Sequence, residues 1–205
     1  MNQRAYHRRI SNRMFDFKEF YLRMARQLPG KSVIAEVGIA DGASAVFMAE
    51  TMLDQGKRFR LHLIDSLDYG GVDQLTTIMR HVVKAEISHV TEILPLDSLN
   101  ASCRFPDNYF DFVFIDASHK LEETKADIRL WFQKVKVDGI LAGHDYNDGE
   151  GAGVKQAVDT LIPRQITRAA IPNQQTFEPE NVLHTEATAN GCGVWWMEKK
   201  FYFNL

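Results

Sequence analysis

The chain has 205 residues, 45% of them hydrophobic and 25% charged, and a formal net charge of −3, as expected of a soluble single domain with a substantial core. No stretch approaches the roughly 18 consecutive apolar residues of a membrane span, and the basic N-terminus lacks the apolar region of a secretory signal. Cys103 and Cys192 are isolated and lack C-x-x-C spacing, which argues against a disulfide framework and a zinc site. We therefore expect a cytoplasmic protein with no membrane partner.

The charge is unevenly distributed along the chain. Residues 1–31 hold eight Lys or Arg side chains against two acids, so this segment carries +6 and the rest of the chain −9. Apolar residues at helical spacing from Phe15 to Leu28, followed by Pro29-Gly30, predict a lead-in helix. A basic arm can hold nucleic acid or an acidic partner, although a solvated helix face explains the same pattern. We divide the chain into this lead-in segment, 1–31, and one domain, 32–205.

The run from Val33 to Ser44 predicts a strand, a glycine turn and the start of a helix. Ser32–Val37 is apolar apart from Glu36, and Ala43–Leu53 carries apolar residues at helical spacing. A glycine turn of this kind brings bare backbone close to a ligand and directs helix N–H groups toward it. The glycine spacing is G-x-x-x-G, which disfavours the G-x-G-x-x-G pattern of nicotinamide dehydrogenases.

Strand and helix patterns alternate through the rest of the chain. Further strands are predicted at Arg60–Asp65, Val90–Leu94, Tyr109–Asp116, Ile140–Asp145, Ile166–Ile171 and Gly193–Met197. Helices are predicted at Val72–Val83, at Leu121–Val135 with Ser118 as a cap, and at Val154–Ile162, with a turn at Asp138-Gly139 and a polar loop at Pro172–Asn190. This alternation predicts an α/β fold, a seven-stranded and mostly parallel sheet with helices on both faces.

Five predicted strands end in an acid or are followed by one. The acids are Glu36, Asp65, Asp97 (followed by Ser98), Asp116 and Asp145. Ligands of open α/β sheets lie beyond the carboxyl ends of the strands, where Asp65 suits a ribose hydroxyl. Each acid also has a simpler interpretation: Glu36 can anchor backbone N–H groups, Asp65 can cap a helix, and Asp97-Ser98 can form a turn. Taken together, the five acids favour a site for a cationic nucleoside ligand.

A second cluster joins Asp116 and His119 to His144 and Asp145. Neighbouring parallel strands lie about 4.8 Å apart, so Asp116, His144 and Asp145 can converge on one divalent cation. A hydrogen-bonded His–Asp network without metal is the alternative. Histidine suits proton transfer near neutral pH, so His119 is a candidate general base, although it can equally be a fourth ligand or cap a helix.

The stretch from Val33 to Lys199 resembles the Rossmann-like fold of class I S-adenosylmethionine (SAM) dependent methyltransferases. Glu36-x-Gly38-x-x-x-Gly42 resembles their motif I, Asp65 their ribose-binding acid and Asp97-Ser98 their adenine-contacting pair. The resemblance implies that SAM is bound by Glu36, Gly38, Asp41, Gly42, Ser44, Asp65, Asp97 and Ser98.

The segment from Phe114 to Val158 is similar to small metal-dependent O-methyltransferases of the catechol and antibiotic-sugar type. In that subgroup, acids after the fourth and fifth strands hold Mg²⁺, which implies Asp116, His144 and Asp145 as ligands here. His144 departs from the usual acid. His119 stands where the catechol enzyme has its lysine base, whereas Ser118 stands where the sugar enzymes have an Asp.

These features predict an enzyme that transfers methyl from SAM to a hydroxyl of a small molecule, with Asp116 and His119 catalytic. Two alternatives are an RNA methyltransferase that uses the basic arm, disfavoured by the acidic overall charge, and a SAM sensor without activity. The acceptor is expected to meet the lead-in helix, the loops Asp68–Asp73, Asp148–Gly153 and Pro172–Asn190, and the aromatic residues Tyr69, Tyr146 and Trp195. The sequence leaves open whether the chain forms a homo-oligomer.

Overall fold

The computed structural model describes residues 4–10, 15–68, 70–147, 152–162 and 182–200. Its helices are η1 (Tyr6–Arg9), α1 (Lys18–Gln27), α2 (Ala43–Asp54), α3 (Gly71–Lys84), α4 (Ser98–Ser102), α5 (Leu121–Lys134) and α6 (Ala152–Leu161). Its strands are β1 (Lys31–Val37), β2 (Arg58–Ile64), β3 (Thr91–Leu94), β4 (Phe110–Ile115), β5 (Val135–Gly143), β6 (His184–Glu186) and β7 (Val194–Glu198). None of the helices in these ranges is long and apolar enough to cross a membrane.

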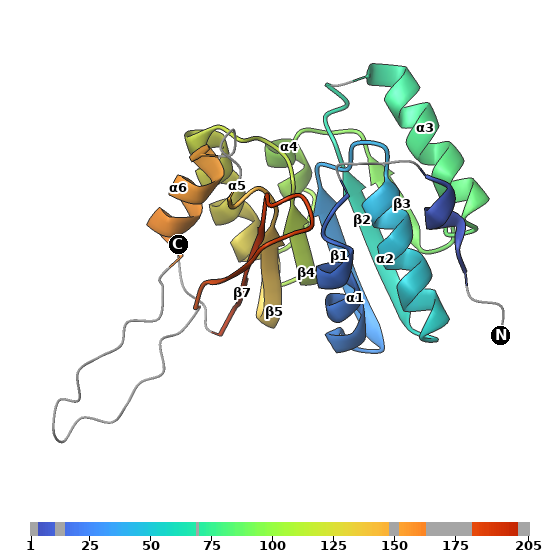
Figure 1. Ribbon diagram of the computed structural model, residues 1–205, viewed down its shortest axis with the longest axis horizontal. Helices are drawn as coiled ribbons and strands as arrows, with labels where there is room; N and C mark the ends of the chain where they lie inside the picture. Colours follow the sequence, from blue (N-terminus) through green and yellow to red (C-terminus); the bar gives the residue numbers. More distant parts are fainter. Residues whose placement is uncertain (1–3, 11–14, 69, 148–151, 163–181, 201–205) are drawn as a thin grey trace, which may run out of the picture.

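The strands form one seven-stranded sheet in the order β3-β2-β1-β4-β5-β7-β6 (Figure 1). The first five strands are parallel, and β7 runs antiparallel to both β5 and β6. The chain reverses its direction of travel across the sheet between β1 and β4, which is where an open α/β sheet binds its ligand. The predicted α/β fold with a mostly parallel seven-stranded sheet is confirmed.

The seventh strand differs from the prediction. β6 lies inside the stretch 172–190, which the polar sequence predicted to be loop, and the predicted strand Ile166–Ile171 lies outside the described residues. β6 is three residues long, and two of its residues are exposed. A short edge strand of this kind carries no apolar alternation, so its pairing with β7 is not visible in the sequence.

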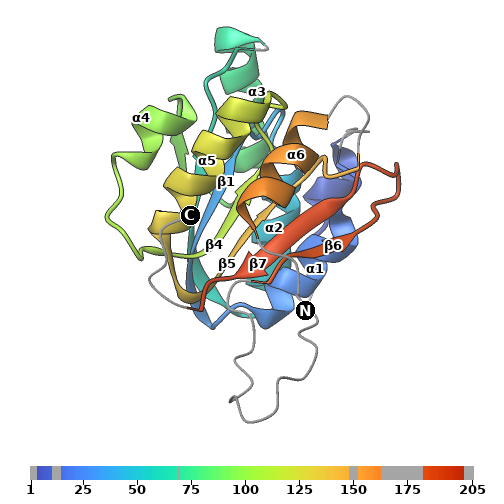
Figure 2. The same cartoon turned by 90° about the vertical axis from the view of Figure 1, so that its left-hand side faces the viewer.

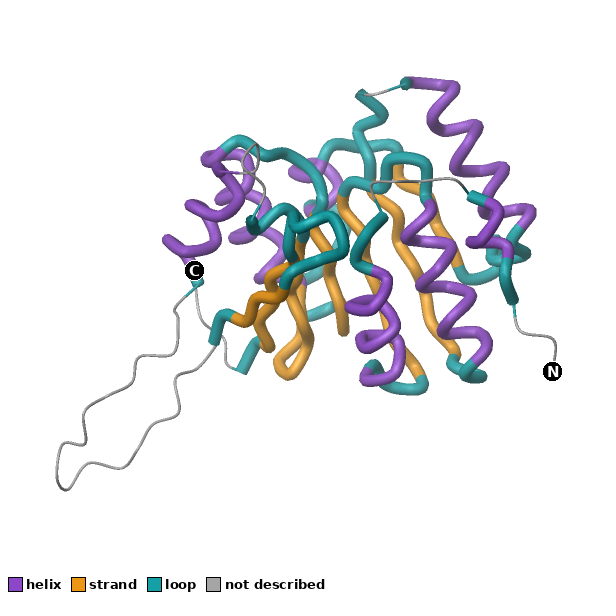
Figure 3. Tube along the Cα trace, viewed as in Figure 1, coloured by secondary structure: helices purple, strands orange, loops and turns teal. Residues whose placement is uncertain are grey.

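Helices cover both faces of the sheet (Figure 2). Side chains of α1, α2 and α3 share one apolar cluster with Phe112 and Phe114 of β4, whereas α4, α5 and α6 share the other with Phe110 and Val113. From Phe112 to Ile115 of β4, successive side chains are buried and alternate between the two clusters. Figure 3 shows the resulting layers, with helices on either side of a central sheet.

The predicted helix at Val72–Val83 is confirmed as α3, which buries Ile78 and Val82 and exposes Val72, Met79 and Val83. Two other local predictions need correction. The turn at Asp138-Gly139 lies within β5, where Asp138 has φ +63° and the pairing with β4 shifts register. Helix α5 is capped at Lys120, and the Ser118 hydroxyl accepts from the Lys120 N–H at 3.2 Å.

Candidate active site

The glycine turn between β1 and α2 packs tightly against the end of β4. Gly38 has φ +81°, and a Cβ built there would lie 1.9 Å from the backbone oxygen of Asp116. The Asp116 N–H donates to the Val37 carbonyl at 2.7 Å, which holds the two strand ends together. Gly42 also has φ +81° and leads directly into α2 as its N-cap residue. Glycine is therefore required at residue 38 both by the positive φ and by the close backbone approach.

Glu36 and Ser44 are brought together beneath this turn. The Ser44 hydroxyl donates to Glu36 Oε1, and Tyr21 of α1 forms a second side-chain hydrogen bond to the same carboxyl. Glu36 is 2% exposed, and burial raises its pKa to about 8. Glu36 therefore anchors side chains of α1 and α2, rather than backbone N–H groups as one interpretation of the sequence proposed.

Asp65 and Asp41 organise the loop at the ends of β1 and β2. Asp65 Oδ2 accepts from the Ile39 N–H at 2.9 Å and Oδ1 from the Leu67 N–H at 2.7 Å. Each carboxylate oxygen has two lone pairs, so Asp65 can still accept from a ribose hydroxyl. Asp41 Oδ1 accepts from the Ala43 N–H at 3.1 Å in the first turn of α2.

Asp97 and Ser98 lie at the start of α4. Asp97 is its N-cap and accepts from the Asn100 N–H at 2.9 Å, and that hydrogen bond lowers its pKa. The Ser98 hydroxyl donates to Asp127 at 2.5 Å and accepts from the Trp131 indole at 2.8 Å. Burial raises the pKa of Asp127 to about 6. Asp97 thus caps a helix, and Ser98 links α4 to α5.

The second cluster is assembled as the sequence predicted. His144 Nδ1 lies 3.1 Å from Asp145 Oδ1 and 3.7 Å from Asp116 Oδ1. His119 Nε2 lies 2.9 Å from the other oxygen, Oδ2, of Asp145. Partial burial raises the pKa of Asp116 and hydrogen bonding to His144 opposes the rise. Burial lowers the pKa of His144, but the hydrogen bonds that its ring donates to Asp116 and Asp145 outweigh burial and raise that pKa to about 11.

A small cavity lies among these residues. Its volume is about 10 Å³, and Asp116, His119, His144, Asp145 and Trp195 are among the residues that line it. That volume holds one water molecule or ion. The Trp195 side chain is 1% exposed, and its Nε1–H has no hydrogen-bond partner among the described residues.

The donor set fits a divalent cation. One donor atom each from Asp116, His144 and Asp145 lies within 4.8 Å of the others. Carboxylate oxygens with an imidazole nitrogen suit Mg²⁺, Mn²⁺ or a borderline transition metal. The opposite ring nitrogen of His144 faces a carboxylate, as is usual for a metal-ligating histidine.

That carboxylate belongs to Asp16, a residue that sequence analysis did not identify as part of the site. Asp16 Oδ1 lies 2.8 Å from His144 Nε2, across 128 residues of sequence. Cys192 lies on the same side of the ring, with donor atoms of Asp16, His144 and Cys192 within 4.8 Å of one another. The sequence places Asp16 inside the predicted lead-in helix, whereas α1 begins at Lys18, and nothing in the sequence relates Asp16 to β5.

The aromatic residues predicted near the acceptor are only partly described. Tyr69 lies outside the described residues, as do 148–151 and 172–181 of the acceptor loops. Tyr146 is buried, and its hydroxyl donates to Asp159 at 2.6 Å. Trp195 packs against Gly143, where a Cβ would lie 2.6 Å from its ring, so it belongs to the core as well as to the small cavity.

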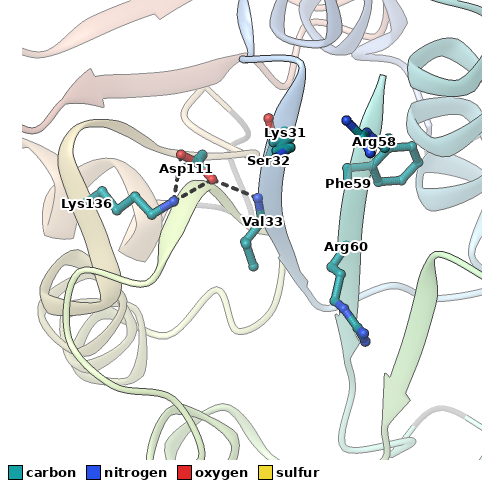
Figure 4. Close-up of a pocket in the computed structure, with 8 residues that line it drawn as sticks. All are labelled: Lys31, Ser32, Val33, Arg58, Phe59, Arg60, Asp111 and Lys136. Carbon is teal, nitrogen blue, oxygen red and sulfur yellow. Dashed lines mark hydrogen bonds and ion pairs between the residues drawn. The ribbon is translucent and has the colours of Figure 1, made fainter. Parts of the chain in front are cut away.

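A larger hollow lies away from all the predicted site residues. It lies at the amino-terminal ends of β1 and β2 (Figure 4). Its volume is about 310 Å³. Asp111 is one of the residues that line it, and it accepts from the Val33 N–H at 2.7 Å and from Lys136 at 2.9 Å (Figure 4). Because ligands of such sheets bind beyond the opposite, carboxyl ends of the strands, this hollow is not the candidate active site.

The sequence from residue 35 to 146, more than half of the chain, matches the family model described as a methyltransferase domain. The chain belongs to this methyltransferase family. Its predicted resemblance to the class I SAM-dependent enzymes is thereby confirmed, together with the fold. No curated protein matches the sequence.

Solved structures share the fold of this methyltransferase at low sequence identity. An O-methyltransferase from Bacillus cereus in complex with SAH (S-adenosylhomocysteine) is 17% identical, with 93% of this chain and 82% of that chain covered and a TM-score of 0.60. The O-methyltransferase TomG from Streptomyces achromogenes, involved in tomaymycin synthesis and in complex with SAM, is 13% identical, with 97% and 88% covered and a TM-score of 0.63. An rRNA methylase from Streptococcus thermophilus is 17% identical, with 94% and 99% covered and a TM-score of 0.62.

Proposed function

We propose that this methyltransferase transfers the methyl group of SAM to a hydroxyl of a small molecule, assisted by a divalent cation such as Mg²⁺. The observation that carries the proposal is the pairing of His119 with Asp145 beside Asp116 and His144, directly next to the glycine turn. The candidate base, the donor set for a cation and the glycine turn thus lie next to one another. Methyl transfer by in-line displacement needs little more than such alignment of acceptor, methyl and sulfur.

His119 would take the proton from the acceptor hydroxyl. Its Nε2 faces Asp145 at 2.9 Å, which leaves Nδ1 as the basic nitrogen and lets the carboxylate stabilise the imidazolium that forms. The His119 side chain is 42% exposed, so an acceptor can reach it from solvent. Asp116, His144 and Asp145 would hold the cation, which when bound lowers the pKa of an acceptor hydroxyl and orients it.

The direct test measures cofactor binding and transfer separately. Calorimetric titration with SAM and SAH is expected to show binding of both, and no binding of either at millimolar concentration would sink the proposal. Transfer of labelled methyl to a panel of catechols, phenols and sugars is expected to require Mg²⁺ and to stop with EDTA. His119→Gln should still bind SAH while transfer falls by about 10²- to 10⁴-fold. Equal transfer with EDTA would remove the cation from the proposal.

An RNA acceptor is the second candidate, because the rRNA methylase resembles this chain as closely as the O-methyltransferases do. Against it, Arg23 of the basic segment pairs with Glu186 at 2.7 Å and is thereby partly neutralised. Salt-dependent RNA binding that disappears when residues 1–13 are removed would favour RNA. A SAM sensor without activity is excluded if Asp116→Ala binds SAM but loses a turnover that the unmodified protein shows.

A further inference from the structure

The ring of His144 is held by two consecutive residues that precede α1. Asp16 Oδ1 lies 2.8 Å from His144 Nε2, and the Asp16 side chain is 2% exposed. The Phe17 ring packs on the His144 ring with their centroids 4.8 Å apart. Both the orientation of the imidazole and the environment of Nε2 are therefore set by the N-terminal segment rather than by β5, the strand that precedes His144.

The contact with Asp16 determines which ring nitrogen carries hydrogen. An ionised carboxylate only accepts hydrogen bonds, so the Nε2 that faces Asp16 must be the N–H donor. In the neutral ring, Nδ1 is then a lone pair directed at Asp145 Oδ1, 3.1 Å away, with Asp116 Oδ1 at 3.7 Å. Three acceptor atoms facing one another require a positive species between them, which is a proton on Nδ1 or a metal cation.

Asp16 also contacts the edge of the sheet that is formed by β6. Its second oxygen, Oδ2, accepts from the Asn190 N–H at 3.0 Å, in the loop between β6 and β7. Helix α1 is tied to the same hairpin by the ion pair between Arg23 and Glu186, at 2.7 Å. In Figure 2, α1 lies beside β6. The N-terminal segment, His144 and the hairpin loop thus meet at one carboxylate.

We infer that Asp16 is the positioning residue of the cation site: it holds His144 with Nδ1 directed at Asp116 and Asp145, and it couples cation binding to the order of the β6–β7 loop. The inference rests on the proposed function, because the cation is the one proposed to assist methyl transfer. Asp16 touches neither the cation nor the acceptor. Its role belongs to the hydrogen-bonding shell around metal ligands, whose loss typically weakens metal affinity by about 10- to 100-fold.

Both oxygens of the Asp16 carboxylate are needed, because each accepts a hydrogen bond, Oδ1 from His144 and Oδ2 from Asn190. Asp16→Asn offers one oxygen and one NH₂ group to two N–H donors, His144 Nε2 and Asn190. If the NH₂ group faces His144, the ring proton moves to Nδ1 and blocks the cation. If it faces Asn190, the loop loses its attachment, and cation binding loses the support that the coupled loop supplies. Either arrangement breaks one half of the proposed coupling.

A competing arrangement uses the other side of the ring. Asp16, His144 Nε2 and Cys192 also lie within 4.8 Å of one another, and thiolate with imidazole suits Zn²⁺ better than Mg²⁺. In that case Asp16 would be a ligand, and Cys192 would matter as much as Asp16. Because one histidine supplies both sites, substitution of Cys192 separates the two arrangements.

The experiment measures Mn²⁺ affinity of the full chain by electron paramagnetic resonance and SAH affinity by calorimetry, for Asp16→Asn, Cys192→Ser and Glu19→Gln. Glu19→Gln is the matched control, an exposed acid three residues further along. We expect Asp16→Asn to weaken Mn²⁺ binding by about 10- to 100-fold with SAH affinity unchanged, and the other two variants to match the unmodified protein. Equal Mn²⁺ affinity in Asp16→Asn, or an equal loss in Cys192→Ser, overturns the inference.

Hydrogen exchange on the unmodified protein gives a second readout that needs no variant. Mn²⁺ is expected to slow exchange at residues 15–17 and 188–190 together, because binding and ordering stabilise each other. Unchanged exchange in both segments overturns the coupling. If the unmodified protein binds SAH but no Mn²⁺, the inference and the proposed role of the cation are rejected, whereas the proposed methyl transfer from SAM is not. If it binds no SAH, the proposed function itself fails.

Discussion

His119 Nε2 lies 2.9 Å from Asp145 Oδ2 although the two residues follow different strands, His119 after β4 and Asp145 after β5. Adjacent parallel strands ending at the same edge bring the two loops together. The pair has the arrangement of a base oriented by a buried acid, since the Asp145 side chain is 9% exposed against 42% for His119. This pair is the most direct target for mutation.

Asp145→Asn keeps the shape of the side chain and removes its charge. We expect kcat/KM for methyl transfer to fall by about 10²- to 10⁴-fold, because His119 loses its orienting acid and the cation loses a ligand. SAH affinity should not change. Glu122→Gln, an exposed acid at the start of α5, is the control and should retain full activity. Near-normal activity of Asp145→Asn would remove the His119–Asp145 pair from the mechanism.

Gly38→Ala is expected to damage both folding and cofactor binding. The positive φ alone costs about 1–2 kcal/mol, and the added Cβ would also meet the Asp116 backbone oxygen at 1.9 Å. Gly56→Ala separates the two effects, because Gly56 has φ +69° with no atom within 4 Å of the added Cβ. Chemical denaturation should show a clearly larger loss for Gly38→Ala, and calorimetry a loss of SAH binding for it alone. Equal losses of stability in the two variants would contradict the close approach of Gly38 to the Asp116 backbone.

Glu36 should make stability fall as pH rises. Its pKa is about 8 in the folded protein against an ordinary value of 4.5, so between those values the folded state holds a proton that the unfolded state has released. The free energy of unfolding should therefore decrease across this range by up to about 1.4 kcal/mol per pH unit. Glu36→Gln cannot titrate, and the difference between the two denaturation profiles isolates the contribution. Parallel profiles from pH 5 to 8, roughly that window, would contradict it.

Tyr21 should control the same titration from α1. Its hydrogen bond to Glu36 lowers the pKa of that carboxyl, against the dominant effect of burial. Tyr21→Phe should reduce stability by about 1 kcal/mol and move the pH window of Glu36 upward. Tyr109→Phe, at a ring that stacks on Phe105, serves as the control. Denaturation profiles recorded against pH for both variants test this, and an unshifted window in Tyr21→Phe would separate Tyr21 from Glu36.

The parallel sheet, the glycine turn and the Asp116–His144–Asp145 cluster were predictable because each depends on local pattern and strand order. Strong apolar runs such as Phe110–Ile115 locate the central strands, and parallel strands then bring their ends to one edge. Asp16 and Tyr21 were not predictable as site residues. Their positions depend on how α1 packs on the sheet, and helical spacing alone does not specify which strand end it will reach.

The sequence alone also could not identify the partners of Ser98 or the buried face of α3. Ser98 follows β3 as an adenine-contacting residue would, and its hydroxyl forms hydrogen bonds with Asp127 and Trp131 of α5, which lie far along the chain. In α3 the sequence shows apolar positions on more than one side, and only packing selects Ile78 and Val82 for burial. Tertiary contacts decide among patterns that are locally equivalent.

The placement of β7 has a consequence for the order in which the protein is made and folds. β7 is later in the sequence than β6 but lies between β6 and β5. The strand that leads into His144 and Asp145 therefore receives its outer neighbour only when residues 194–198 have been synthesised. The strands around the glycine turn lie early in the chain and pair over shorter sequence separations. During synthesis, the half of the sheet around the glycine turn can therefore form before the half that leads into His144 and Asp145 is completed.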